Sequence, residues 1–151
     1  MTDEFDSAPS ATHHRNSWTS LHDYYESEYG QRDAHFRFRY IVNRLLDSPA
    51  CERFTIGEAF LHGREGTTGR GLYFTNAWYG QLFDVPYVVA YPNINDVNTH
   101  LAVDYVHGTE TISSHICQPR KEIPCLLSLL DQLSLNTRGV PWRKNKTDTL
   151  D

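Results

Sequence analysis

The sequence predicts one α+β domain: helices come first, a mainly antiparallel, split β-sheet follows, and an apolar helix or strand closes the chain. Its 151 residues suffice for a single domain with one core. A long segment near the N-terminus has the apolar spacing of a helix, and several short strand-like runs separated by turn residues follow it. No internal repeat or domain boundary interrupts this order. We therefore predict a flexible tail over 1–16, one domain over 17–140 and a polar tail over 141–151.

The first predicted helix is Trp18–Tyr29. Ser17 and Thr19 are both residues of the kind that cap a helix N-terminus, and Gly30 is predicted to end the helix. The preceding segment, 1–16, is polar and rich in small and turn-forming residues. Such a composition indicates a tail without fixed structure.

The second predicted helix, Arg32–Leu46, has the clearest pattern in the chain. Its apolar residues recur with the spacing of a buried stripe: Ala34, Phe38, Ile41, Val42 and Leu45. Another side of the helix carries Arg37, Tyr40 and Arg44. This side is either a solvated face whose arginine stems cover the core or a basic and aromatic line that meets phosphates. The turn residues Asp47-Ser48-Pro49 are predicted to end the helix.

Short runs after the helices are predicted to form the sheet. The predicted strands are Arg53–Ile56, Ala59–His62, Leu72–Thr75, Tyr87–Tyr91, Leu101–Val106 and Thr111–Ile116. Asn76–Phe83 is expected to be a short helix or a loop, and His107-Gly108-Thr109 a β-turn between the last two strands. The Leu-rich run Ile123–Leu135 predicts a closing helix that stops near Asn136–Gly139.

Composition limits the classes of function. The net charge of −5 argues against a globally basic nucleic-acid binder, although eleven arginines against three lysines leave room for local arginine sites. The three cysteines form no CxxC pair and no zinc spacing, and no metal site is predicted. This cysteine count and the polar N-terminus favour an intracellular protein, cytoplasmic or nuclear. No membrane contact is expected, because no apolar run approaches the ~20 residues of a span.

The stretch HGREGTTGRGLYF, from His62 to Phe74, is the most unusual part of the chain. Its four glycines allow positive φ and a close approach of backbone to a ligand. Arg64 and Arg70 are of the residue type that forms bidentate contacts with phosphate. The stretch matches neither the P-loop nor the dinucleotide fingerprint, so its spacing alone favours the tip of a β-hairpin.

The order of the motifs resembles the catalytic domain of the poly(ADP-ribose) polymerase-like ADP-ribosyltransferases. In that family one strand ends in His-Gly-Ser or His-Gly-Thr, a later strand opens as Gly-Lys-Gly-Ile-Tyr-Phe-Ala, and a third begins with a glutamate. Here His62-Gly63 is similar to the first motif, GRGLYFT (Gly69–Thr75) to the second, and Glu110 to the third. The likeness covers roughly Tyr40 to Leu130, and GRGLYFT is its most specific part.

This resemblance implies an enzyme that takes NAD as its substrate and transfers ADP-ribose to a protein or nucleic-acid acceptor. The catalytic residues would be His62, Tyr73 and Glu110. His62 would hydrogen-bond the ribose, Tyr73 would stack on the nicotinamide, and Glu110 would stabilise the oxocarbenium-like transition state. The NAD-binding residues would be His62, Gly63, Arg70, Tyr73 and Phe83.

A binding module without catalysis is the alternative hypothesis. Ten residues separate His62 from Tyr73, where the family has a helix and long loops. The alternative module would use the hairpin tip Arg64–Arg70, the Arg37 and Arg44 helix face and the basic C-terminal tail to meet nucleic acid or an acidic protein. A transferase requires its three catalytic residues to converge on one cleft, whereas the module requires its arginines to share an exposed face.

Overall fold

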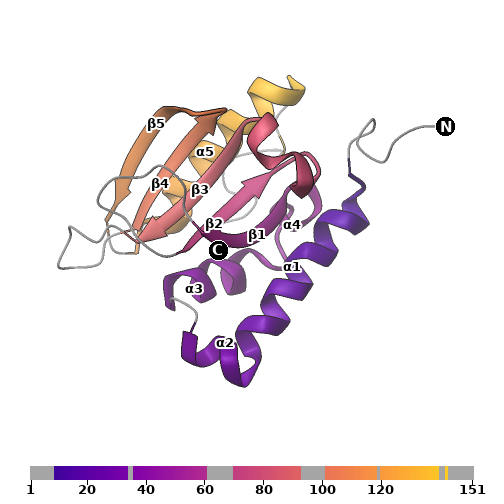
Figure 1. Ribbon diagram of the computed structural model, residues 1–151, viewed down its shortest axis with the longest axis vertical. Coiled ribbons are helices and arrows are strands. Elements are labelled where there is room, and N and C mark those ends of the chain that lie inside the picture. Colours follow the sequence, from indigo (N-terminus) through magenta and orange to yellow (C-terminus); the bar gives the residue numbers. More distant parts are fainter. Residues whose placement is uncertain are drawn as a thin grey trace.

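The computed structural model describes residues 9–33, 36–60, 70–92, 101–118, 120–139 and 142. Its elements confirm the α+β fold class: N-terminal helices, an antiparallel sheet and a C-terminal helix (Figure 1). The helical elements are α1 (Ala11–Glu26), α2 (Glu28–Asp33), α3 (Phe36–Leu45), α4 (Ala50–Arg53), the 3-10 helix η2 (Tyr79–Asp84) and α5 (Glu122–Arg138). The strands are β1 (Thr55–Phe60), β2 (Arg70–Thr75), β3 (Tyr87–Pro92), β4 (Leu101–His107) and β5 (Glu110–Cys117).

The five strands form one antiparallel meander in the order β1-β2-β3-β4-β5. The described strands thus make a continuous sheet, not the split sheet expected from the sequence. The β4–β5 hairpin turns at Gly108, which has a φ of 68°, in the left-handed region that favours glycine. This turn confirms the interpretation of His107-Gly108-Thr109 as a connection between strands.

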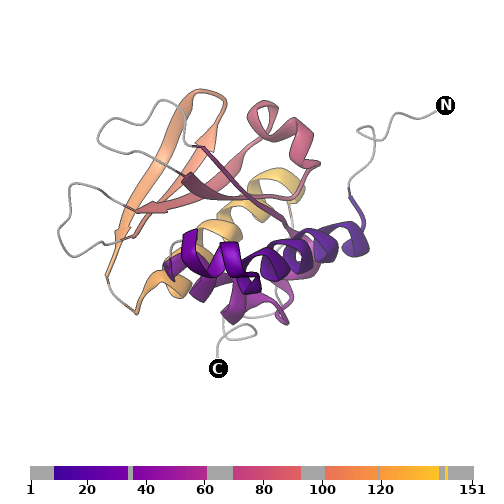
Figure 2. The same ribbon diagram turned by 60° about the horizontal axis from the view of Figure 1, so that its bottom comes forward.

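The main core lies between one face of the sheet and the α-helices, which gather on that side (Figure 2). The buried stripe predicted for the second helix is confirmed: Phe38, Ile41, Val42 and Leu45 all face this core. Ala34 lies outside the described residues. The opposite face of the sheet carries a smaller cluster in which Leu82 of η2 packs among Tyr73, Tyr87, Val89 and neighbouring residues.

Helix α1 begins at Ala11, so the prediction of a flexible tail up to residue 16 is wrong for its last six positions. The Ser10 side chain caps the helix by accepting from the His13 backbone N–H at 3.1 Å. His14 is buried on this first turn, and its Nδ1 lies 2.7 Å from Thr55 Oγ1. Tertiary contacts to β1 therefore fix a segment whose composition reads as a tail.

The predicted helix Trp18–Tyr29 is divided at Ser27, and Gly30 lies inside α2 instead of ending a helix. The Ser27 backbone N–H bonds the carbonyls of Asp23 and Tyr24, which ends α1. A Cβ added at Gly30 would lie 1.9 Å from the Tyr24 carbonyl oxygen. Glycine at this position thus lets the two helices approach closely.

The first two predicted strands also need correction. Residues 50–53 form the short helix α4, and the run from Thr55 to Phe60 is one strand. The other predicted strands, the short helix within Asn76–Phe83 and the C-terminal helix are confirmed. In the predicted polar tail, Trp142 is buried, with its ring centroid 5.4 Å from that of Phe54.

Candidate binding sites

Tyr73, the predicted nicotinamide-stacking residue, lies on β2 with its side chain 1% exposed. Its hydroxyl donates to the Phe60 carbonyl oxygen at 3.1 Å, and its ring packs on Tyr87 with 5.5 Å between centroids. A ring that stacks on a ligand needs one face open to it. In this structure the Tyr73 ring is part of the smaller core cluster.

Glu110 lies far from Tyr73 on the same sheet. It is the first residue of β5, an exposed position that pairs with His107. Since neighbouring strands lie about 4.8 Å apart, β2 and β5 are separated by about 14 Å. Through β3 and β4, Tyr73 is in register with Ser114, and Glu110 lies about 13 Å further along β5 at 3.3 Å per residue. The structure does not bring these two predicted catalytic residues together.

The other predicted NAD-binding residues are placed only in part. His62 and Gly63 lie outside the described residues, and for Phe83 the structure describes the backbone, in η2. Arg70 forms an ion pair with Glu58 and lies over the Phe60 ring, with 4.9 Å between Cζ and the centroid. Its charge is thus already neutralised by a neighbouring carboxylate on β1.

A first candidate site is a hollow of about 450 Å³ beside α3, called here the α3 hollow. Its lining residues are Phe36, Arg37, Tyr40, Arg120 and Glu122. Helix α3 contributes the first three, and the β5–α5 connection and the first residue of α5 contribute the other two. Two aromatic side chains stay exposed in it, Phe36 by 60% and Tyr40 by 42%.

The charged residues of the α3 hollow differ in their pairing. Arg37 and Glu122 form an ion pair whose side chains are only 11% and 4% exposed. Arg120 is exposed and forms no ion pair with another residue in the described part of the chain. Arg120 is also the only described residue other than glycine with a positive φ, 68°, a conformation that costs roughly 1–2 kcal/mol for most side chains. Such strain is concentrated at functional positions of proteins.

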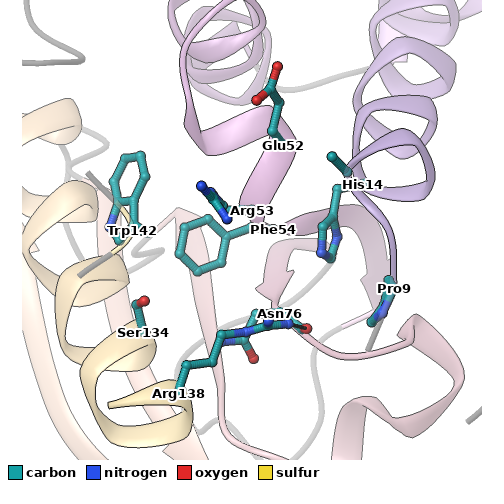
Figure 3. A pocket seen from close by; sticks show the side chains of 10 residues that line it. Pro9, His14, Glu52, Arg53, Phe54, Asn76, Ser134, Arg138 and Trp142 are labelled. Atoms are coloured by element: carbon teal, nitrogen blue, oxygen red, sulfur yellow. Dashed lines mark hydrogen bonds between the residues drawn. The ribbon is translucent and has the colours of Figure 1, made fainter. Parts of the chain in front are cut away.

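A second candidate site is a cavity of about 120 Å³, called here the Trp142 cavity (Figure 3). Its lining residues are Pro9, Ala11, His14, Glu52, Arg53, Phe54, Asn76, Ser134, Arg138 and Trp142. The start of α1, the α4–β1 junction, the end of β2 and the end of α5 all converge on it. Burial, together with electrostatic repulsion by Arg138, His13 and Arg53, lowers the pKa of His14 to about 4.

Neither site contains Tyr73, Arg70 or Glu110. The sequence did indicate two of the five residues that line the α3 hollow, because Arg37 and Tyr40 belong to the basic and aromatic line on the second predicted helix. The Trp142 cavity was missed. Its residues come from distant segments, and the only local signal was the Pro9-Ser10 pair, typical of residues before a helix.

Comparisons with known proteins identify no relative: no family model, no curated protein and no solved structure matches the chain. None of the described helices is long and apolar enough to cross a membrane. Within the described ranges, no three His, Cys, Asp or Glu side chains lie close enough to hold a metal ion. Function therefore has to be argued from the two sites themselves.

Proposed function

We propose that the protein is a non-enzymatic binding module that takes a segment of a partner protein into the α3 hollow. The observation that carries this proposal is the pairing of exposed Phe36 and Tyr40 with a hollow large enough for one or two side chains. Single exposed apolar residues are common on protein surfaces, but exposed aromatics that line one concave site are typical of interaction surfaces.

The charges of the α3 hollow determine which partner segment it would bind. Glu122 neutralises Arg37, so Arg120 contributes the remaining positive charge at the rim. A complementary segment has an aromatic or large aliphatic anchor for the hollow and a carboxylate for Arg120. The strained backbone of Arg120 supports this assignment, since a glycine there would avoid the strain but would lack the guanidinium.

A protein partner fits these charges better than a nucleic acid does. Of the arginines predicted to contact phosphates, Arg37 and Arg70 each form an ion pair with a glutamate. A nucleic-acid site needs several unpaired cations on one face, because phosphate contacts supply most of its affinity. The overall charge of −5 opposes such binding further.

The proposal is tested by selecting peptides from a random displayed library on the wild-type protein. Peptides with an aromatic or aliphatic anchor beside Asp or Glu should be enriched. Their affinity, measured by calorimetry, should fall at least about tenfold in Tyr40→Ala and in Arg120→Ala. Tyr29→Ala is the matched control, because Tyr29 is an exposed aromatic on α2 that does not line the hollow.

Two outcomes would contradict the binding-module proposal. One is a selection that yields the same peptides on the Phe36→Ser/Tyr40→Ser double variant as on the wild type. The other is tight binding of a single-stranded oligonucleotide that weakens steeply with salt, which is the behaviour of a phosphate-binding surface.

The transferase hypothesis is kept as the alternative proposal, and GRGLYFT supports it. It requires the Tyr73 ring to become accessible and Glu110 to act in a different arrangement from the one predicted. Titration with NAD separates the two proposals. Saturable binding at millimolar NAD that is lost in Tyr73→Ala and in Glu110→Gln would favour the transferase, and the binding module predicts no binding.

A further inference from the structure

We propose that the Trp142 cavity is a binding site for a small organic oxyanion, with its carboxylate or phosphate group held by Arg53 and Arg138 and its apolar part against Phe54 and Trp142. The site is separate from the α3 hollow and does not depend on the proposed protein partner. A cavity of about 120 Å³ holds a small molecule and is too small for a peptide segment.

The cavity carries excess positive charge. Arg53 and Arg138 form no ion pair with any residue in the described ranges. Arg138 is held in place by one hydrogen bond, which its Nη2 donates to the Asn76 carbonyl oxygen at 2.8 Å. The one lining carboxylate, Glu52, pairs with Arg15 at 3.3 Å and points away from Asn76 and Arg138 (Figure 3).

Polar groups at the cavity wall add directional contacts. The His14 ring points from α1 into the space between Phe54 and Asn76 (Figure 3). It is 2% exposed, and Thr55 Oγ1 lies next to its Nδ1, so its Nε2 is the nitrogen left to meet a ligand. The first turn of α1 also lines the cavity with Ala11, and a helix N-terminus favours negative charge.

One side of the cavity is apolar. The rings of Phe54 and Trp142 meet edge to face, and both side chains are buried. An inorganic ion would leave this wall without contacts, whereas a small organic acid would bury its apolar part there. The combination of an aromatic wall with two arginines that form no ion pair within the described ranges therefore indicates an organic acid.

The test uses the full chain labelled with ¹⁵N, and inorganic phosphate, acetate and benzoate as the probes. The indole N–H of Trp142 and the side-chain amide of Asn76 report on the cavity directly. We expect saturable shifts of both signals with each probe, and tighter binding of benzoate than of acetate. Arg138→Gln and Arg53→Gln should each weaken benzoate binding about tenfold or more, since each removes a charge-assisted contact.

Arg70→Gln is the matched control, because neither Arg70 nor its partner Glu58 lines the cavity. Arg53 and Arg138 are exposed, so both variants should keep the wild-type spectrum. An equal loss of binding in Arg70→Gln would mean general charge attraction and would overturn the proposal, as would the absence of saturation in the wild type. Benzoate binding no tighter than acetate would overturn the role given to the aromatic wall. If the α3 hollow fails its own peptide test, the result of this titration is unaffected.

Discussion

The α3 hollow and the Trp142 cavity are built in opposite ways. The hollow is open and lined by exposed aromatics, and its buried charges are paired with each other. The cavity is small, lies against the main core, and has arginines without a paired carboxylate among the described residues. The first arrangement suits a macromolecular partner that supplies its own apolar anchor, and the second suits a small anion.

The two sites should also differ in how much their aromatic residues contribute to the stability of the fold. Phe54 and Trp142 belong to the core cluster, so the cavity wall is part of what holds the fold together. Phe36 and Tyr40 are exposed, so we expect their substitution to change stability less. Exposed residues of either site can be substituted without loss of the fold, whereas substitution of the buried rings in the cavity wall should destabilise it.

The largest expected effect on stability comes from a substitution in the wall of the Trp142 cavity. Phe54→Ala removes a fully buried ring that contacts Trp142, and we expect a loss of about 4 kcal/mol in the free energy of unfolding. Phe36→Ala in the α3 hollow should change stability by less than about 1 kcal/mol. Urea unfolding of both variants measures the contrast. Similar losses in the two would show that the hollow is part of the core.

The next largest effect on stability is expected from loss of the Arg37–Glu122 ion pair, which lines the α3 hollow. Glu122→Gln leaves the Arg37 guanidinium without its buried counter-charge, which should cost about 3 kcal/mol. The matched change, Glu52→Gln, removes a half-exposed pair with Arg15 and should cost between about 0 and 1 kcal/mol. The comparison is made by chemical denaturation at neutral pH. A Glu122→Gln protein as stable as the wild type would mean that this pair is effectively solvated.

The pH dependence of stability should come from the Trp142 cavity. The pKa of His14 is lowered from 6.5 to about 4 in the folded protein, so below pH 6.5 the unfolded chain binds a proton that the folded chain does not. The neutral ring contributes nothing above pH 6.5, and stability should fall by about 2–3 kcal/mol between pH 6.5 and 4. Denaturation at several pH values checks this. His14→Gln should remove this part of the slope, and an unchanged slope in that variant would assign it to other groups.

The smallest expected effect separates stability from binding at the α3 hollow. Arg120→Gly relieves the positive φ and should stabilise the fold by about 1 kcal/mol, while peptide affinity falls because the guanidinium is lost. Arg120→Ala loses the same affinity but keeps the backbone strain. Thermal unfolding and calorimetry distinguish them. A glycine variant that is no more stable than the alanine variant would show that the backbone is not strained there.

The sequence predicted those elements whose signal is local. The stripe of α3 follows from Phe38, Ile41, Val42 and Leu45 alone, because a helix brings these positions to one side. Likewise, the turn at Gly108 and the apolar run of β3 can be recognised from the local sequence alone. The antiparallel order of the sheet then follows from the short connections between strands.

The sequence could not predict features that depend on distant partners. In the sequence, His14 and Trp142 both lie in segments predicted to be polar tails. In the structure, His14 contacts Thr55 and Trp142 contacts Phe54, and neither contact has a local sequence signal. Gly30 reads as a helix break, although its role is a close approach to Tyr24. The separation of Tyr73 from Glu110 also depends on distant parts of the chain. The meander puts β3 and β4 between the strands that carry these two predicted catalytic residues.

The central claim, that the α3 hollow is where the protein meets a partner, is tested most directly by titrating the ¹⁵N-labelled protein with a selected acidic, aromatic peptide. We predict that the largest shifts fall on Phe36–Tyr40 and on Arg120 and Glu122, with small changes at Tyr73 and Glu110. Shifts that centre on β2 and the start of β5 instead, or that NAD reproduces, would contradict the claim and favour the transferase.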